Sequence, residues 1–187
     1  QIAEFFRHHR DTYLLRENKQ LHNLDDNFAR LKALGIRVIR LPVTWAITYP
    51  DHSYSIDPGH GKAKIVIPAT THIVLIQDPF YPKTKWASIP IADIETILKK
   101  ANRYGLKVII DIHAYPGGSS DGTYNGVWPS TPLFWSTGRD KDGNAIYQRN
   151  FRTIVDNLFK WSSELFSRKD QAEANALLGI SPMNEPA

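Results

Sequence analysis

Apolar positions in the first half of the chain follow helical spacing and then strand spacing, twice in succession. A helix is predicted up to Gly35 from apolar residues that recur three or four positions apart: Leu24, Phe28, Leu31 and Leu34. Residues 36–43, IRVIRLPV, then predict a buried strand that ends at Pro42. A second helix is predicted over residues 90–104, and the apolar run 106–113 predicts the strand that follows it.

The second half of the chain repeats this order once more. A long amphipathic helix is predicted over residues 146–167, a short helical piece over 171–176, and an apolar strand from Leu177. Helices and strands that alternate in this way predict an α/β fold with a mainly parallel sheet and right-handed crossovers. The carboxyl ends of such strands lie at one edge of the sheet, where α/β barrels hold their catalytic groups.

Two long segments follow the first two predicted strands. Within residues 44–89, the strand-like runs 65–67 and 73–76 are predicted to pair as a hairpin. Residues 114–144 contain turn-forming glycines and prolines. They also contain aromatic residues that either contact a sugar or pack as a small local core: Tyr115, Tyr124, Trp128, Phe134 and Trp135. Because both segments follow strands, we expect them to line one deep cleft.

Polar side chains interrupt the apolar strands near their ends. Arg40 lies near the end of the first strand, and an unpartnered buried guanidinium is costly, so Arg40 should meet a carboxylate or a ligand. A purely structural ion pair is the alternative, and the two are compatible. The last strand leads into Asn184, Glu185 and Pro186, and Pro186 ends the ladder. An Asn beside a Glu can hold a hydroxyl group while the Glu moves a proton. Alternatively, Glu185 begins a helix and interacts favourably with its dipole.

Composition narrows the functional classes. The chain has 187 residues, 42% hydrophobic and 11% aromatic, which is typical of a folded domain. It has no cysteine, which excludes disulfides and thiolate metal sites. The net charge is +4, but the basic residues are interleaved with acids, which favours a solvated surface over nucleic-acid binding. No apolar run approaches the roughly 18 residues of a membrane helix.

Three segments, IRVIRLPVTW, VIIDIHAYPGG and ISPMNEP, resemble consecutive strand-end motifs of glycoside hydrolase family 5, which contains cellulase-like retaining β-glycosidases. The HHRDTYL stretch and the HAYPGG loop resemble the exo-β-1,3-glucanase-like branch more than the plain endocellulases. The resemblance covers most of residues 3–187, apart from parts of 50–85. It implies a (β/α)8 TIM barrel, of which this chain holds the second to fourth strands with long βα loops.

The resemblance also implies roles for individual residues. Glu185 matches the acid/base of the family, and Asn184 matches the residue that holds the 2-hydroxyl of the sugar being cleaved. Arg40 matches an arginine that supports the catalytic carboxylates, His113 contacts the same sugar subsite, and Asp111 orients neighbouring groups beneath the site. Four aromatic residues are further candidates for substrate contact: Trp45, Tyr115, Trp128 and Trp135. No metal and no cofactor are implied.

The implied reaction is hydrolysis of O-glycosidic bonds in β-glucans or related β-linked saccharides by retaining double displacement. It needs a protonated acid and an ionised carboxylate about 5 to 5.5 Å apart. The nucleophilic glutamate belongs to the seventh strand of the family, which would follow Ala187, as the first strand would precede Gln1. We therefore expect residues 1–187 to be the N-terminal part of a catalytic domain, completed by the rest of the barrel from the same precursor or from a second chain.

A non-catalytic carbohydrate-binding remnant of the same fold is the alternative. A glutamate at the end of the seventh strand of the complete protein would favour the enzyme, and its absence would favour the remnant. The expected partner in either case is a β-linked glucan or oligosaccharide, with neither nucleic acid nor membrane involved. The family resemblance implies secretion, although residue 1 does not begin a signal peptide.

Overall fold

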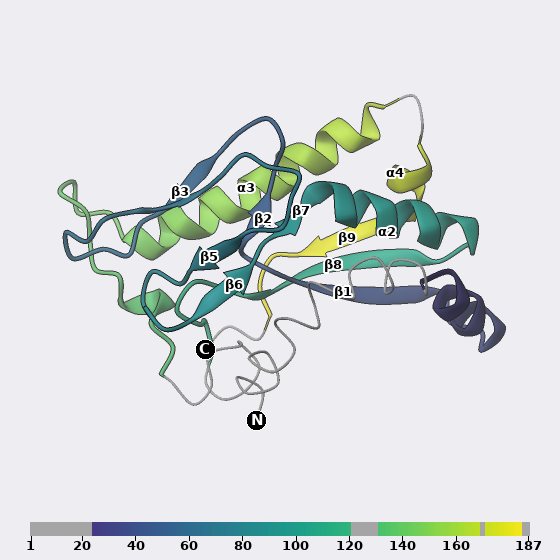
Figure 1. The fold of residues 1–187 in the computed structure, drawn as a ribbon, viewed down its shortest axis with the longest axis horizontal. Helices are drawn as coiled ribbons and strands as arrows, with labels where there is room; N and C mark the ends of the chain where they lie inside the picture. Colours follow the sequence, from purple (N-terminus) through teal and green to yellow (C-terminus); the bar gives the residue numbers. More distant parts are fainter. Residues whose placement is uncertain (1–23, 121–130, 169–170, 185–187) are drawn as a thin grey trace.

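The computed structural model describes residues 24–120, 131–168 and 171–184 of the chain. Its central element is a three-stranded parallel sheet (Figure 1). In spatial order the sheet consists of β1 (Val38–Thr44), β8 (Lys107–Ala114) and β9 (Leu177–Ser181). Because the spatial order equals the chain order, the sheet agrees with the predicted succession of helix–strand units. Within the described part of the chain the strands do not close into a barrel.

A helix precedes each strand of this sheet. Residues 24–33 are helical before β1, and α2 (Ile91–Arg103) precedes β8. Before β9 come the long α3 (Ile146–Phe166) and the short α4 (Ala172–Ala176). Gly105 follows the end of α2 at a φ of +68°, in the left-handed region that glycine tolerates best. The predictions of the second and third helices and of the short helical piece are therefore confirmed to within a residue or two.

The hydrophobic core lies on the face of the sheet that α2 covers, and α3 lies on the same side (Figure 1). Its fully buried members include Ile94 and Leu98 of α2 and Val108, Ile110 and Ile112 of β8. Along β1 the burial alternates, as the two-residue period of a strand requires. Ile39, Leu41 and Val43 are covered, whereas the residues of the other face are exposed: Val38, Arg40 and Pro42.

Three details of the sequence prediction are wrong. The first strand does not end at Pro42 but continues to Thr44, because an edge strand tolerates a residue without an N–H. Arg40 therefore lies in the middle of β1 rather than near its end. Leu34 and Phe166, assigned to buried helix faces, are 77% and 55% exposed because each lies at the end of its helix, where less of the chain covers it.

The predicted hairpin between residues 65–67 and 73–76 is also wrong. β4 (Ile65–Ile67) instead pairs antiparallel with the earlier β3 (Tyr54–Ile56). The turn between them contains Gly59, His60 and Gly61, all with positive φ, whereas Pro68 to Thr71 contain no residue suited to such a turn.

The second half of this insertion forms a separate hairpin. β5 (Leu75–Gln77) pairs antiparallel with β6 (Lys85–Ala87). At the base of the insertion, β2 (Ile47–Thr48) pairs parallel with β7 (Ile89–Pro90), which brings the two ends of the insertion together. The described residues of the second insertion include a 3-10 turn, η2 (Phe134–Ser136).

Candidate active site

Four polar side chains predicted from the sequence meet near the sheet. Arg40 Nη2 lies 2.8 Å from Asp111 Oδ2 and donates a hydrogen bond of 2.5 Å to Asn184 Oδ1. His113 Nδ1 lies 2.8 Å from the same Asp111 oxygen. These residues come from β1, β8 and the segment after β9, so one cluster joins all three strands. The prediction that Arg40 meets a carboxylate is confirmed.

Asp111 is the centre of this cluster and has no exposed side-chain surface. A buried carboxylate is stable only when charged or hydrogen-bonding groups compensate its lost hydration. Arg40 and His113 supply that compensation to Oδ2, whereas Oδ1 has no hydrogen-bond partner in the described part of the protein. Asp111 therefore holds the two side chains that contact its Oδ2.

Asn184 is held at two points. Its backbone N–H donates to the carbonyl of Ile112 at 3.2 Å, and its side-chain oxygen accepts from Arg40. A guanidinium can only donate, so the amide oxygen must face Arg40 and the amide NH2 group is turned elsewhere. That NH2 group is a donor suited to a hydroxyl oxygen.

Arg40 and His113 remain accessible although Asp111 is buried. Their side chains are 53% and 35% exposed, because the helices cover only the opposite face of the sheet. The cluster thus presents a guanidinium and an imidazole to a ligand while it hides the carboxylate that holds them. This arrangement can position a polar substrate beside a strand end.

Two of the aromatic candidates are fully buried in this structure. Trp45 packs edge-on against Trp86, with the ring centroids 6.4 Å apart. Tyr115 stacks on Phe151, and its hydroxyl donates to the carbonyl of Pro182. Neither ring offers a face to a sugar here, so the structure places both in the core rather than on a cleft wall.

Tyr115 also contributes to the electrostatics beneath the cluster. Burial, together with the nearby negative charge of Asp111, raises the pKa of the Tyr115 phenol well above its ordinary value. The phenol therefore remains protonated at physiological pH and acts as a hydrogen-bond donor, in this case to Pro182. This bond fixes the turn that leads from β9 toward Asn184.

Trp135 is half-buried, and its indole N–H donates to the carbonyl of Ser119 at 2.8 Å. Its ring contacts Phe134 and Tyr147 edge-on. These rings form a local aromatic core, which is one of the two alternatives that the sequence left open. Glu185 and Trp128 lie outside the described residues, so the contacts of the candidate acid/base and of this fourth aromatic residue are not part of this geometry.

A structural residue that the sequence analysis did not identify fixes the loop after β8. Asp78 is buried, and its Oδ1 accepts from the backbone N–H groups of Phe80 and Tyr81 at 2.8 and 3.0 Å. Its Oδ2 accepts from the indole N–H of Trp86 at 2.9 Å and from the N–H of Gly117 at 3.0 Å. Asp78 thus connects the β5–β6 hairpin to the loop after His113. The Asp-Pro dipeptide at 78–79 is a turn signal. It indicates the hydrogen bonds of Asp78 to the nearby N–H groups of Phe80 and Tyr81, but not its contact with Gly117.

No group of three or more His, Cys, Asp or Glu side chains that could hold a metal ion occurs in residues 24–120, 131–168 and 171–184. In the same ranges no helix has the length and apolar character needed to cross a bilayer.

Comparison with known proteins shows the family of the chain. A search of curated proteins finds no match to the chain. The family model described as Cellulase (glycosyl hydrolase family 5) matches residues 7–186, nearly the whole sequence. The match includes the three strands, both insertions and the Arg40–Asp111–His113–Asn184 cluster. The chain therefore belongs to the cellulase family, glycosyl hydrolase family 5.

Proposed function

We propose that the chain forms the acid/base side of the active site of a retaining β-glycosidase, with Glu185 as the acid/base. The observation that carries the proposal is the cluster of Arg40, Asp111, His113 and Asn184. Arg40 of this cluster donates to the side chain of Asn184, the immediate neighbour of Glu185, and the backbone N–H of Asn184 donates to the carbonyl of Ile112. A residue fixed in this way limits where the next side chain can lie. Family membership supports glycoside hydrolysis in general.

The residue types suit the chemistry of this reaction. A retaining glycosidase protonates the leaving oxygen with one carboxylic acid and attacks the anomeric carbon with a second carboxylate. Glu185 would give its proton to the leaving oxygen and then accept one from water. The Asn184 amide NH2 would donate to the 2-hydroxyl, and His113 would contact the same sugar unit. Arg40 would favour the ionised form of a nucleophile through its positive charge.

The nucleophile in this proposal comes from the remaining strands of the barrel, supplied by the same precursor or by a second chain. The exposed face of β1, with Val38, Arg40 and Pro42, is the surface that those strands would cover. We further propose a β-linked glucan or oligosaccharide as substrate, with the exo-β-1,3-glucanase-like branch as the nearest type, and secretion as the location.

The test is Glu185→Gln in the intact protein. Removing a general acid typically costs about 10²- to 10⁴-fold in rate, and the loss is larger for a leaving group that needs protonation. We expect turnover of an unactivated β-glucan to fall by at least about 10²-fold. Hydrolysis of an aryl glycoside with an acidic phenol should be much less affected in its first step.

Glu164→Gln is the matched control, because Glu164 lies on the exposed surface of α3 and pairs with Lys160 at 4.0 Å. This variant should hydrolyse both substrates normally. Hydrolysis of the unactivated glucan by Glu185→Gln at a near-normal rate, with the fold intact by circular dichroism, would refute the acid/base assignment.

A further inference from the structure

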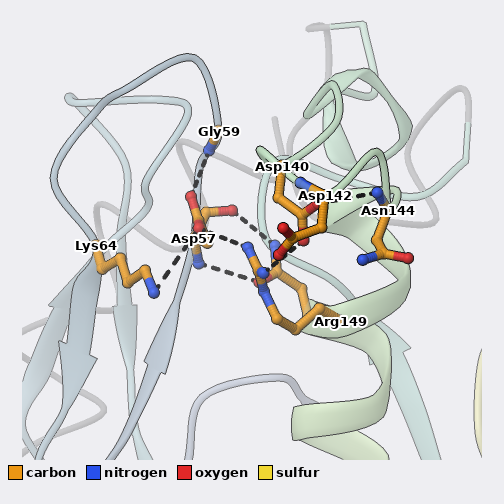
Figure 2. A network of polar contacts seen from close by, with 8 residues as sticks. Asp57, Gly59, Lys64, Asp140, Asp142, Asn144 and Arg149 are labelled. Atoms are coloured by element: carbon orange, nitrogen blue, oxygen red, sulfur yellow. Dashed lines mark hydrogen bonds and ion pairs between the residues drawn. The ribbon is translucent and has the colours of Figure 1, made fainter.

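A second polar site lies away from the sheet, between the two insertions. A cavity of about 360 Å³ is lined by residues of the β3–β4 turn and by residues 137–141. Figure 2 shows the polar network at its wall, where Asp57 and Asp140 approach Arg149 of α3. The family relationship and the candidate active site leave this cavity without a role.

Cations outnumber carboxylates around this cavity. Four cationic side chains line it, against the carboxylates of Asp57 and Asp140: Lys62, Lys64, Arg139 and Lys141. Both carboxylates are already engaged by Arg149, which donates to Asp57 Oδ2 at 2.8 Å and to Asp140 Oδ2 at 3.0 Å. One guanidinium thus bridges the two acids and reduces their attraction for the lysines.

The remaining acceptor positions of both acids are also occupied. Asp57 Oδ1 accepts from the N–H of Gly59 at 2.8 Å, and Lys64 lies 3.9 Å from Asp57 Oδ2. Asp140 Oδ1 accepts from two backbone N–H groups of its own loop, those of residues 142 and 144. The acids therefore serve the local structure rather than a ligand cation.

Several donors around the cavity have no acceptor in the described part of the chain. Lys62 and Lys141 form no ion pair there. Thr137 is among the residues that line the cavity, and its buried hydroxyl has no hydrogen-bond partner in the described residues. Ile146, the first residue of α3, also lines the cavity, and this helix has neither a side-chain cap nor an acidic residue in its first turn. The positive end of its dipole adds to the field of the lysines.

The wall of the cavity is rigidly built. His60 Nε2 lies 3.0 Å from the carbonyl oxygen of Ser136, which joins the two insertions. Gly59 approaches the backbone of Thr137 so closely that an added Cβ would lie 1.9 Å from its carbonyl oxygen. These contacts hold the backbone on the two sides of the cavity in place.

We propose that this cavity binds an oxyanion group, which would be the carboxylate of an acidic saccharide or a phosphate or sulfate. Lys62, Lys141 and Arg139 supply the charge, and the Thr137 hydroxyl donates a hydrogen bond. A cation or a neutral sugar would not neutralise the excess positive charge of these side chains. Binding here does not depend on the proposed hydrolysis, so each proposal can fail without the other.

The experiment is isothermal titration calorimetry of the intact protein with sodium phosphate, sodium sulfate and sodium glucuronate at constant ionic strength. We expect saturable binding of at least one oxyanion. The double variant Lys62→Gln/Lys141→Gln should bind it at least about tenfold more weakly, because charge-assisted hydrogen bonds are lost. Lys32→Gln/Lys83→Gln removes the same net charge from exposed positions outside the cavity and should bind normally.

Thr137→Val provides a second, independent measurement. The Thr137 hydroxyl has no partner in the described structure, so its removal should leave the melting temperature unchanged or raise it. The same variant should weaken oxyanion binding. Tighter binding of glucuronate would identify an acidic saccharide as the ligand, and tighter binding of phosphate or sulfate a tetrahedral anion. Absence of saturable binding, or equal weakening in both double variants, would overturn the proposal.

Discussion

Asp111 determines the geometry of the candidate active site because the side chains of Arg40 and His113 both contact its Oδ2 oxygen. Arg40 and His113 both lie 2.8 Å from Oδ2. The sequence predicted a partner for Arg40 from the cost of burying a guanidinium, and the ion pair with Asp111 is present, but the premise is wrong because the Arg40 side chain is 53% exposed. It could not predict that Trp45 and Tyr115 are buried, because a sequence shows a ring but not the neighbours that fold over it.

The first prediction concerns Asp111→Asn. The substitution keeps the shape of the side chain but removes the charge that both partners use. We expect the free energy of unfolding to fall by about 1.5–3 kcal/mol, the range for hydrogen bonds to charged groups. Urea denaturation would measure it. Asp156→Asn, at an exposed position of α3, is the control and should change stability by less than about 0.5 kcal/mol. Equal stability of the two variants would contradict the supporting role of Asp111.

The second prediction concerns pH. Hydrogen bonds from the N–H groups of Asn144 and Asp142, together with the charge of Arg149, lower the pKa of the Asp140 carboxyl below its ordinary value. A lowered pKa in the folded state stabilises the fold above the unfolded pKa of about 4, and the stabilisation disappears as pH falls through the folded value.

Asp140→Asn should therefore melt at a lower temperature than the unchanged protein at neutral pH. The gap between the two melting curves should close on acidification below about pH 4. Differential scanning calorimetry across a pH series would show it. A gap of constant size from neutral to strongly acidic pH would argue against an ionised Asp140 as the stabilising group.

The elements of this chain differ in how far the sequence predicts them. The helices and the sheet strands were predicted because their periods of apolar residues are long and end in recognisable signals such as Gly105. The hairpins of the first insertion were not, because runs of three residues carry almost no periodicity and pairing depends on the turn. The run Gly59–Gly61, with three positive φ angles, decides that β4 turns back onto β3.

The third prediction tests this turn. Gly59→Ala places a Cβ 1.9 Å from the Thr137 carbonyl oxygen at a φ of +77°, so the two insertions must move apart. Gly61→Ala has a similar φ of +71° but meets nothing within 4 Å. The control should cost about 1–2 kcal/mol for its left-handed backbone, and Gly59→Ala clearly more. Equal losses in chemical denaturation would show that the close contact is unimportant.

Among the described residues, the central sheet has one face covered by α2 and a second face that is partly exposed along β1. α2 and the core lie on one face, whereas Val38 on the other is 43% exposed. An apolar strand residue left open in this way is expected where further barrel strands complete the interior. Arg40, on the same face as Val38, would then lie at the inside of the completed barrel.

The fourth prediction follows from this asymmetry and is made for the intact protein. If the proposed barrel covers Val38, Val38→Asp buries an unpaired carboxylate and should destabilise by about 3 kcal/mol or more. Val66→Asp, on the β3–β4 hairpin and 59% exposed, should behave as a surface substitution. Thermal denaturation would measure the melting temperatures of both variants. Equally small decreases in the two would contradict coverage of the β1 face by further strands.

The position of Arg40 has a consequence for how the sheet aligns. Its guanidinium bonds Asp111 of β8 and Asn184 after β9, so one side chain connects three strands. A slip of β8 by one residue would turn Asp111 to the opposite face, and a slip of two would move it by about 6.6 Å. Either displacement exceeds what a contact of 2.8 Å tolerates. Arg40 therefore favours a single register of the three strands, because a shifted pairing would break at least one of its two bonds.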